Sequence, residues 1–307
     1  MKKVILSLCA LIVISTLTYS RGIKVISNEP IPLPNTETGY NPVLSPAGDY
    51  LLITGNDLKG LQKYDLATGQ LHTLTTDKGA GFDVQISENG NLVAYRSQQY
   101  KNRLRYTSLK TVDMSTGKRN EVVKESRDLE KFIIKDGTVL AVENGSLKTK
   151  RLTGKPLKSV PVISSIKKGQ LYTTQNKKST LISPAGTNIN YLWTSISPDG
   201  KKLLYYIIEH GRAYVSNPDG SNPVSLGVLR APKWMGDNWV VGMEDYDDGS
   251  VITASKIVAV AANGSNRTVL TADAVIATNP SSSADATKIV YNTADGQVYL
   301  MNIEILQ

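Results

Sequence analysis

Cysteine and histidine are almost missing from this chain of 307 residues. Its one cysteine is Cys9, and its two histidines are His72 and His210. Zinc sites in proteins are built mainly from these two residue types, several of them together. The sequence therefore predicts no metal site, and with one cysteine it predicts neither a disulfide within the chain nor a catalytic thiol.

Motifs that mark other enzyme classes are missing as well. The chain has no Gly-x-Ser-x-Gly turn for a serine hydrolase, and none of its glycine-rich loops ends in the Lys-Ser or Lys-Thr of a phosphate-binding loop. The acidic segment at residues 244–250 departs from the EF-hand spacing. We interpret it as a solvated hairpin, with a calcium loop as the alternative. We expect no catalytic residue and no cofactor.

Long hydrophobic runs are confined to the N-terminus. Two lysines precede the mostly apolar residues 4–17, and small residues follow up to Ser20. This arrangement is typical of a cleaved signal peptide, which we place at residues 1–20. An uncleaved anchor is the alternative, although the run is short for a membrane span. Cys9 lies too early for a lipoprotein attachment site. We expect a periplasmic or secreted protein whose mature part, residues 21–307, is one domain without a transmembrane segment.

Positive charge is in excess but is not concentrated. The formal net charge is +8 at pH 7, and the lysines and arginines are scattered along the chain. Nucleic-acid-binding proteins carry basic stripes interleaved with exposed aromatic side chains, and no such stripe is evident. We therefore expect no nucleic-acid partner, a mild preference for acidic surfaces or glycans, and a monomer.

The chain repeats one phrase, which consists of a strand, a tight turn and an apolar strand. Residues 194–208 read TSISPDGKKLLYYII, where Pro198, Asp199 and Gly200 suit a type I turn that ends in a left-handed glycine. A second strand pair follows each copy and also contains a glycine turn. The related phrases are VLSPAGDYLLIT, VQISENGNLVAY, FIIKDGTVLAV, SSIKKGQLYTT, KWMGDNWVVGM and SSSADATKIVYN.

These repeats predict an all-β protein, a β-propeller of four-stranded antiparallel blades. About seven copies of about 40 residues each, with almost no helical periodicity, are the signature of that fold. The apolar run at residues 203–208 is then covered on both faces by neighbouring blades. The last copy ends one strand short, and residues 22–28 supply a strand that completes the last blade. Six blades is the alternative, because the third and fourth repeats are short.

Two passages resemble the repeats of TolB-like β-propellers. They are Ser-Pro-Asp-Gly-Lys with its apolar strand at residues 197–206, and Asn-Pro-Asp-Gly-Ser-Asn at residues 217–226; residues 45–54 and 262–270 match next best. The resemblance covers most of the mature chain and implies a bacterial periplasmic or extracellular propeller used as a protein-binding platform. The TolB family proper has a further α/β domain, for which this chain is too short, so no role of that domain is carried over.

The same resemblance suggests a comparison with oligogalacturonate lyases, which share a TolB-like seven-bladed fold. Those enzymes rely on a metal held largely by histidines. His72 and His210 lie in different repeats and cannot supply such a cluster. The resemblance therefore does not carry a metal site to this chain.

Candidate binding residues are those just ahead of the inner strands, where the loops of a propeller meet at the mouth of its central channel. Tyr191, Trp193 and Trp234 form a possible aromatic face, of the kind common in interaction hot spots, with packing between blades as the alternative. The candidates are Tyr40, Asn41, Asp83, Arg127, Asp128, Tyr191, Trp193, Lys233 and Asn279.

Three functions agree with these features. The first is a non-catalytic propeller that binds a protein or a cell-envelope component. The second is a glycan-binding or glycan-processing propeller, similar to a polysaccharide lyase, in which Asp83, Arg127 and Asp128 contact sugar in the channel. The third is a lyase or hydrolase with a metal in the channel. The lack of every catalytic motif favours the first, although fold alone does not decide function.

Overall fold

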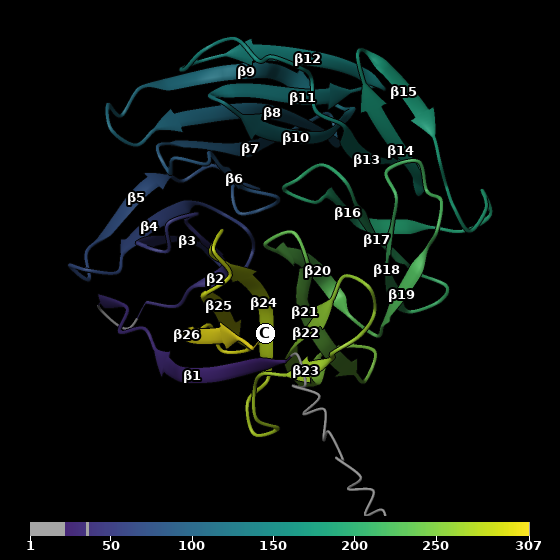
Figure 1. Cartoon of the computed structure of the whole chain (residues 1–307). Helices are drawn as coiled ribbons and strands as arrows, with labels where there is room; N and C mark the ends of the chain where they lie inside the picture. Colours follow the sequence, from purple (N-terminus) through teal and green to yellow (C-terminus); the bar gives the residue numbers. More distant parts are fainter. Residues whose placement is uncertain (1–21, 35–36, 307) are drawn as a thin grey trace, which may run out of the picture.

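The computed structural model describes residues 22–34 and 37–306, which form β-strands and the loops between them. The strands make seven antiparallel sheets arranged as the blades of a seven-bladed β-propeller (Figure 1). This architecture and the number of blades confirm the prediction from the repeats. Among the described residues, no helix has the length and apolar character needed to cross a membrane.

The first three blades occupy the N-terminal half of the chain. Blade 1 contains β2 (Tyr40–Leu44), β3 (Tyr50–Thr54), β4 (Leu61–Asp65) and β5 (Leu71–Thr75). Blade 2 contains β6 (Gln85–Ile86), β7 (Leu92–Lys101), β8 (Leu104–Asp113) and β9 (Arg119–Ser126). Blade 3 contains β10 (Leu129–Lys135), β11 (Thr138–Glu143) and β12 (Ser146–Arg151).

The remaining four blades follow in chain order. Blade 4 contains β13 (Ile163–Lys167), β14 (Gln170–Gln175) and β15 (Lys178–Leu181). Blade 5 contains β16 (Tyr191–Ile196), β17 (Leu203–Ile207), β18 (Arg212–Ser216) and β19 (Val224–Gly227). Blade 6 contains β20 (Arg230–Met235), β21 (Trp239–Asp247), β22 (Ile252–Ala261) and β23 (Thr268–Val269). Blade 7 contains β24 (Ala277–Ser282), β25 (Lys288–Thr293), β26 (Val298–Ile305) and β1 (Ile23–Pro30).

Blades 3 and 4 contain three paired strands each, whereas the other blades contain four. These are the two short repeats of the sequence. After β12 and after β15 the chain runs to the next inner strand without forming a fourth strand. The short repeats therefore reduce the width of two blades and leave the number of blades at seven.

In blades 1, 2, 5 and 7 a serine side chain holds the turn between the first two strands. In blade 5, Ser197 Oγ donates to Asp199 Oδ1 at 2.6 Å, and the Lys202 amide donates to Ser197 Oγ at 2.9 Å. Gly200 has a φ of 77°, the left-handed conformation that glycine adopts without a Cβ clash. Local chemistry thus fixes the turn, which explains why the Ser-Pro-Asp-Gly phrase predicted it correctly.

The core lies between adjacent blades. Every residue of β17 is buried. Leu204 and Tyr206 pack with Val240 and Val258 of blade 6, while Tyr205 packs on the other side in a cluster with Leu171 of blade 4. Because alternate side chains of a strand point to opposite faces, a strand between two blades must be apolar throughout. This arrangement confirms the interpretation of the apolar run for residues 203–207. It was wrong for Ile208, which follows the strand and is 48% exposed.

The ring is closed by the N-terminal strand. β1 pairs antiparallel with β26 from Ile23 opposite Ile305 to Pro30 opposite Tyr299, with a register shift between Val25 and Ser27. Ile23 is buried in the cluster shared by blades 6 and 7, and Ile31 is buried against blade 1. The predicted closing strand is therefore confirmed. The predicted signal peptide lies outside the described residues.

Strand direction defines the two faces of the ring. Since neighbouring strands of a blade are antiparallel, the loops that enter the inner strands and the hairpins between second and third strands lie on one face. We call this the channel-mouth face. The turns between first and second strands lie on the opposite face. Two hairpins on the channel-mouth face are long, because β7, β8, β21 and β22 have nine or ten residues each.

Candidate binding face and channel

Five inner strands have a residue in the left-handed conformation near their start. The φ angles are 46° at Asn41, 56° at Asp83, 46° at Trp193, 45° at Ala231 and 54° at Asn279. In blades 1, 5, 6 and 7 the register shifts at this place, as a β-bulge does. Asparagine and aspartate tolerate this conformation, whereas for tryptophan it is an outlier. Four of the predicted candidates thus occupy one repeated position on the channel-mouth face.

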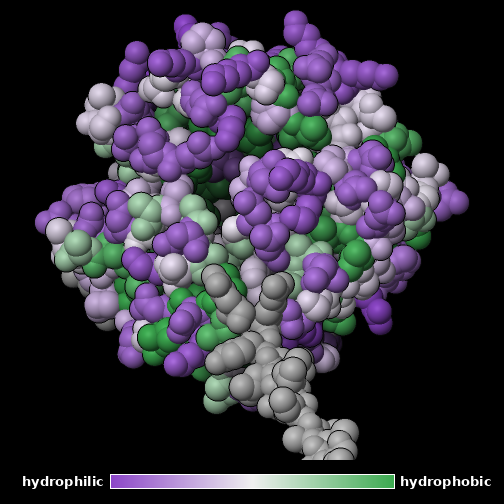
Figure 2. Space-filling model, in the orientation of Figure 1, coloured by the Kyte–Doolittle hydropathy of each residue, from purple (hydrophilic) through white to green (hydrophobic). Residues whose placement is uncertain are grey.

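The residue that follows the bulge belongs to a second repeated position. Lys233 is the first paired residue after the shift in blade 6, and Lys131 is the first after the shift in blade 3. Seven inner strands surround the channel. In the order β6, β10, β13, β16, β20, β24 and β2, each strand contacts the next. Figure 2 shows a face of the ring that is hollowed near its centre. Long side chains at this position are therefore placed to reach the channel.

Asp83 is surrounded by cationic side chains. Lys131 Nζ lies 2.7 Å from Asp83 Oδ1, and Arg96 Nη2 lies 3.8 Å from Asp83 Oδ2. Gln85 Nε2 donates to Asp83 Oδ1 at 3.3 Å. These groups come from blades 2 and 3, so the cluster joins two neighbouring blades beside the channel.

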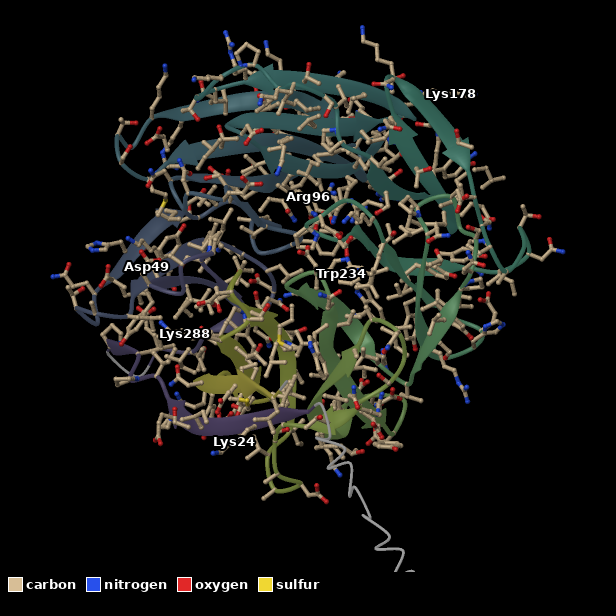
Figure 3. The ribbon with its side chains drawn as sticks, viewed as in Figure 1. Lys24, Asp49, Arg96, Lys178, Trp234 and Lys288 are labelled. Carbon is tan, nitrogen blue, oxygen red and sulfur yellow. The ribbon has the colours of Figure 1, made fainter. Side chains whose placement is uncertain are left out.

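Arg96 is held in place from several sides. Its Nη1 donates to the Leu129 carbonyl at 3.0 Å and its Nη2 to the Glu130 carbonyl at 2.9 Å. The guanidinium lies 5.5 Å from the centre of the Phe82 ring and 5.2 Å from that of the Phe132 ring, within the range of cation–π contacts. Figure 3 shows Arg96 near the middle of the ring, whereas Lys178 and Lys24 lie at its periphery. Arg96 therefore contributes a fixed positive charge near the channel.

Lys233 approaches this cluster from blade 6, on the other side of the ring. Burial lowers the pKa of its ammonium group to about 8; the negative charge of Asp83 raises it, and the positive charge of Lys131 lowers it further. None of the described residues forms an ion pair with Lys233 within 4.0 Å. The charges of Asp83 and Lys131 thus act on Lys233, although no ion pair joins Lys233 to either residue.

A third group of candidates lies between blades 1 and 7. The Asn41 amide donates to Asn292 Oδ1 at 3.2 Å, and Asn279 Nδ2 lies 3.4 Å from the same atom. Tyr40 is half-buried beside Gly296, where an added Cβ would meet its ring. Asn292 itself is buried. These amides brace the junction between the first and last blades, and their hydrogen bonds leave little free polar capacity for a ligand.

The three aromatic candidates do not form one surface. Tyr191 is fully buried, and its hydroxyl accepts from the Ala185 amide at 2.8 Å. Trp234 is partly buried against the blade 5–6 cluster, with Nε1 3.4 Å from the Ser195 carbonyl. Trp193 is 37% exposed and meets Tyr206 edge-on at 4.9 Å between ring centres. Only Trp193 therefore presents an aromatic surface to solvent, and the packing alternative describes Tyr191 and Trp234.

Arg127 and Asp128 lie in the loop that enters blade 3, and both are exposed. The Asp128 amide donates to Ser126 Oγ at 3.1 Å, and its carbonyl accepts from the Asn144 amide at 3.0 Å. These backbone bonds fix the loop and leave both side chains on the surface. The two residues therefore belong to the channel-mouth face and are separate from the buried Asp83 cluster.

Sequence reasoning missed Arg96, Lys131 and Phe82. A signal for Arg96 existed, because it is the one charged residue in the apolar stretch Leu-Val-Ala-Tyr-Arg-Ser. Lys131 could have been found from its equivalence with Lys233. Phe82 directly precedes Asp83 and is 51% exposed. Its exposure depends on the loop conformation, which no local pattern encodes.

The acidic segment at residues 244–250 is a hairpin between β21 and β22, as expected. Asp248 Oδ1 accepts from the Ser250 and Val251 amides, each at 2.9 Å. Asp245 points inward, where Arg230 Nη1 lies 3.0 Å from its Oδ2, and burial raises the pKa of its carboxyl group. Among residues 22–34 and 37–306, no three His, Cys, Asp or Glu side chains are grouped as metal ligands would be.

One larger cavity lies away from the channel. It has a volume of about 590 Å³ and sits between the turns of blades 5 and 6 on the face opposite the channel mouth. Its walls include Trp239, Val224 and Leu306, together with the asparagines of both turns. No charged cluster faces it, apart from the single Lys202.

Comparison with known proteins gives likeness of fold only. No family model matches the chain, and no curated protein matches its sequence. Among solved structures, a GH74 enzyme from Niastella koreensis has a TM-score of 0.61 at 9% identity, over 89% of this chain and 53% of that one. TolB from Acinetobacter baumannii has a TM-score of 0.50 at 14% identity, over 76% of this chain and 54% of that one.

An oligogalacturonate lyase in complex with manganese is also similar. It has a TM-score of 0.48 at 14% identity, over 86% of this chain and 76% of that one. The chain spans about half the length of the TolB and GH74 structures. At these identities the likeness defines the class of protein, a seven-bladed β-propeller related in fold to TolB, and nothing narrower.

Proposed function

We propose that this protein is a non-catalytic binding propeller which holds a protein or cell-envelope component on its channel-mouth face. The observation that carries the proposal is the distribution of exposed large apolar side chains. Nine of the fourteen in the described residues lie on this face. They are Phe82, Tyr100, Leu104, Leu192, Trp193, Ile208, Val228, Tyr246 and Val251.

Such a distribution favours a binding surface, because apolar groups gathered on one face mark sites of protein interaction more often than scattered ones do. The two long hairpins extend this surface. Tyr100 is 64% exposed near the tip of the β7–β8 hairpin, and Tyr246 is 62% exposed near the tip of the β21–β22 hairpin. Exposed tyrosine and tryptophan are frequent anchors in protein interfaces.

The strained backbone of Trp193 supports the same surface. A left-handed tryptophan is disfavoured by about 1 kcal/mol or more, and such strain tends to persist where it serves a site. The bulge holds the ring half-exposed beside the channel. The expected export of the chain, from its N-terminal segment, would place this face in the periplasm or outside the cell.

The test is an affinity capture from the cell envelope with the full chain, a C-terminal tag and mild crosslinking. We expect one reproducible partner that is lost with Trp193→Asn and with Tyr246→Ser. Asparagine suits the left-handed backbone at position 193, so the fold is retained. Leu181→Ser and Val269→Ser remove exposed apolar side chains on outer strands away from this face and are the matched controls. A partner retained by all four variants would contradict the proposal.

A glycan-binding propeller is the second candidate, and the pairing of Phe82 with Asp83 favours it. An exposed aromatic ring beside a carboxylate and an arginine offers both stacking and hydrogen bonding to a sugar. In this case the capture would retain envelope polysaccharide without a protein. Loss of that material with Phe82→Ala, but not with Tyr246→Ser, would move the assignment to this function.

A further inference from the structure

We propose that the outer edge of blade 3 binds an extended acidic peptide segment of a partner protein, which adds to β12 as the fourth strand of that blade. This surface lies at the rim of the ring, where β12 is the outermost strand of its blade (Figure 1). The proposal goes beyond the proposed function, because it names a second contact surface and the chemistry of the segment that binds there.

The first observation is an unpaired strand edge. β12 pairs with β11 on one side only, whereas five blades add a fourth strand at this place. Asn144 and Gly145, both with positive φ, form the two-residue turn between β11 and β12. In such a hairpin the residues that flank the turn bond to each other, so the backbone groups of Leu147, Thr149 and Arg151 point away from β11. No backbone hydrogen bond in the described part of the chain reaches these groups.

The edge is also open to solvent. Five of the six residues of β12 are exposed, whereas three of the five residues in β18, the third strand of blade 5, are buried. The loop that follows β12, residues 152–162, forms no backbone hydrogen bond with it. An incoming peptide would therefore meet a row of accessible donors and acceptors about 20 Å long, at about 3.4 Å per residue.

The second observation is the distribution of charge over the blades. Residues 129–190, which form blades 3 and 4, contain 11 lysines and arginines but 3 aspartates and glutamates. The whole chain contains 35 and 27, so its other residues carry equal numbers of the two signs. The net charge of +8 therefore belongs to the sector of the ring that has the incomplete blades. Such a field attracts acidic partners and speeds their association.

Several of these cations lack an internal partner. The two lysines of β12 are engaged, one by the Glu143 carboxylate and the other by the Glu121 carbonyl. Arg151 at the end of β12, and Lys155 and Lys158 in the loop that follows, form no ion pair with the described residues. All three are exposed. Carboxylates of a strand bound to β12 would find them available.

Charge and composition favour an acidic peptide over other occupants. A second copy of this chain would bring a cationic edge against a cationic edge, and lysines on an edge strand oppose that pairing. Sugars and nucleic-acid bases usually stack on exposed aromatic rings. Leu181 is the one exposed large apolar side chain of the described residues in blades 3 and 4, so this sector offers no such ring. A polypeptide alone can extend the backbone ladder of β12.

The direct test uses the full chain and a labelled eight-residue peptide of alternating glutamate and threonine. We expect fluorescence anisotropy to give a Kd below about 100 μM at low salt, weakened about tenfold or more in about 0.5 M salt. A peptide of the same sequence with alternate amides N-methylated keeps every charge but cannot complete the ladder. It should bind about tenfold or more weakly. Hydrogen exchange at the Leu147, Thr149 and Arg151 amides should slow only with the unmodified peptide.

Variants locate the site on β12. Thr149→Pro removes one outward N–H on an edge strand, where proline is tolerated, and should weaken binding about tenfold or more. Arg151→Glu, which reverses an exposed charge, should do the same. The matched control is Lys24→Glu on β1, the outermost strand of blade 7, which should change the Kd by less than about twofold (Figure 3). Circular dichroism checks the folding of each variant.

Three results would overturn the inference. The first is no binding of the acidic peptide up to about 1 mM, and the second is equal binding of the unmodified and N-methylated peptides, which would mean attraction by charge alone. The third is tighter binding of polygalacturonate or of phosphatidylglycerol vesicles without slower exchange in β12, which would assign the sector to a polysaccharide or a membrane surface. The Trp193 and Tyr246 variants should bind the peptide as the wild type does, so failure here leaves the proposed function standing.

Discussion

Lys131 of blade 3 forms an ion pair with Asp83 of blade 2, with Nζ and Oδ1 2.7 Å apart. Both side chains are largely shielded from solvent, at 17% and 20% exposure. The pair thus bridges two blades at the point where the loop of one meets the inner strand of the next. Its removal should affect stability more than removal of an exposed carboxylate would.

Asp83→Asn tests this relationship. Asparagine tolerates the φ of 56°, so the variant removes the charge and leaves the backbone as it is. We expect a loss of about 1–3 kcal/mol in the free energy of unfolding, because Lys131 and Arg96 then lack their shared counter-ion. Urea denaturation measures it, and Asp128→Asn on the exposed loop is the control. Equal midpoints for the two variants would show that the ion pair contributes no stability.

The closing strand allows a comparison within one element. Ile23 and Ile26 both lie in β1, but Ile23 is 7% exposed in the core whereas Ile26 is 55% exposed. Ile23→Ala should lower the free energy of unfolding by about 2–4 kcal/mol, as large-to-small core substitutions do. Ile26→Ala should change it by less than about 0.5 kcal/mol. If neither substitution changed the free energy of unfolding, β1 would not unfold together with the rest of the propeller.

The sequence predicted the fold well because its signals are local. The Ser197–Asp199 hydrogen bond and the left-handed Gly200 are determined by neighbouring residues, and the same phrase recurs along the chain. The apolar β17 likewise reports two covered faces without any knowledge of its neighbours. Repeated local signals of this kind are enough to count blades. The short third and fourth repeats still carry this signal. They therefore reduce the number of strands but not the number of blades.

The candidate site was predictable only in part. Asn41, Asp83, Trp193 and Asn279 were found because each lies near the start of an inner strand, which is a local position. Tyr191 lies in the same kind of place, but its ring turns into the core, where its hydroxyl binds Ala185. The convergence of Arg96 and Lys131 on Asp83 depends on contacts between residues of two blades. Such contacts are set by closure of the ring and have no counterpart in a sequence window.

The bulge at Asn279 offers a test of backbone strain. This residue has a φ of 54°, and its side chain is near Thr278 and Asn292. Asn279→Ala should be destabilising, because alanine disfavours the left-handed conformation by about 1 kcal/mol or more. Asn279→Gly loses the same amide but tolerates the backbone, so it should be the more stable of the two variants. Thermal unfolding ranks them, and an alanine variant as stable as the glycine variant would refute the strain argument.

The lowered pKa of Lys233 predicts how stability changes with pH. In the unfolded chain a lysine titrates near about 10.4, whereas in the folded protein the pKa of Lys233 is about 8. Between these values the unfolded state binds more protons than the folded state. The free energy of unfolding should therefore rise with pH between pH 8 and about 10. Below pH 8 Lys233 is charged in both states, so it adds no pH dependence there.

Lys233→Met isolates this contribution, since methionine has similar length and no charge. Urea denaturation of the wild type and the variant at several pH values between 7 and about 10 gives the difference in stability as a function of pH. We expect the advantage of Lys233→Met over the wild type to be largest near pH 7 and to shrink as the pH rises. A difference that stays constant with pH would mean that the ammonium group is fully solvated in the channel.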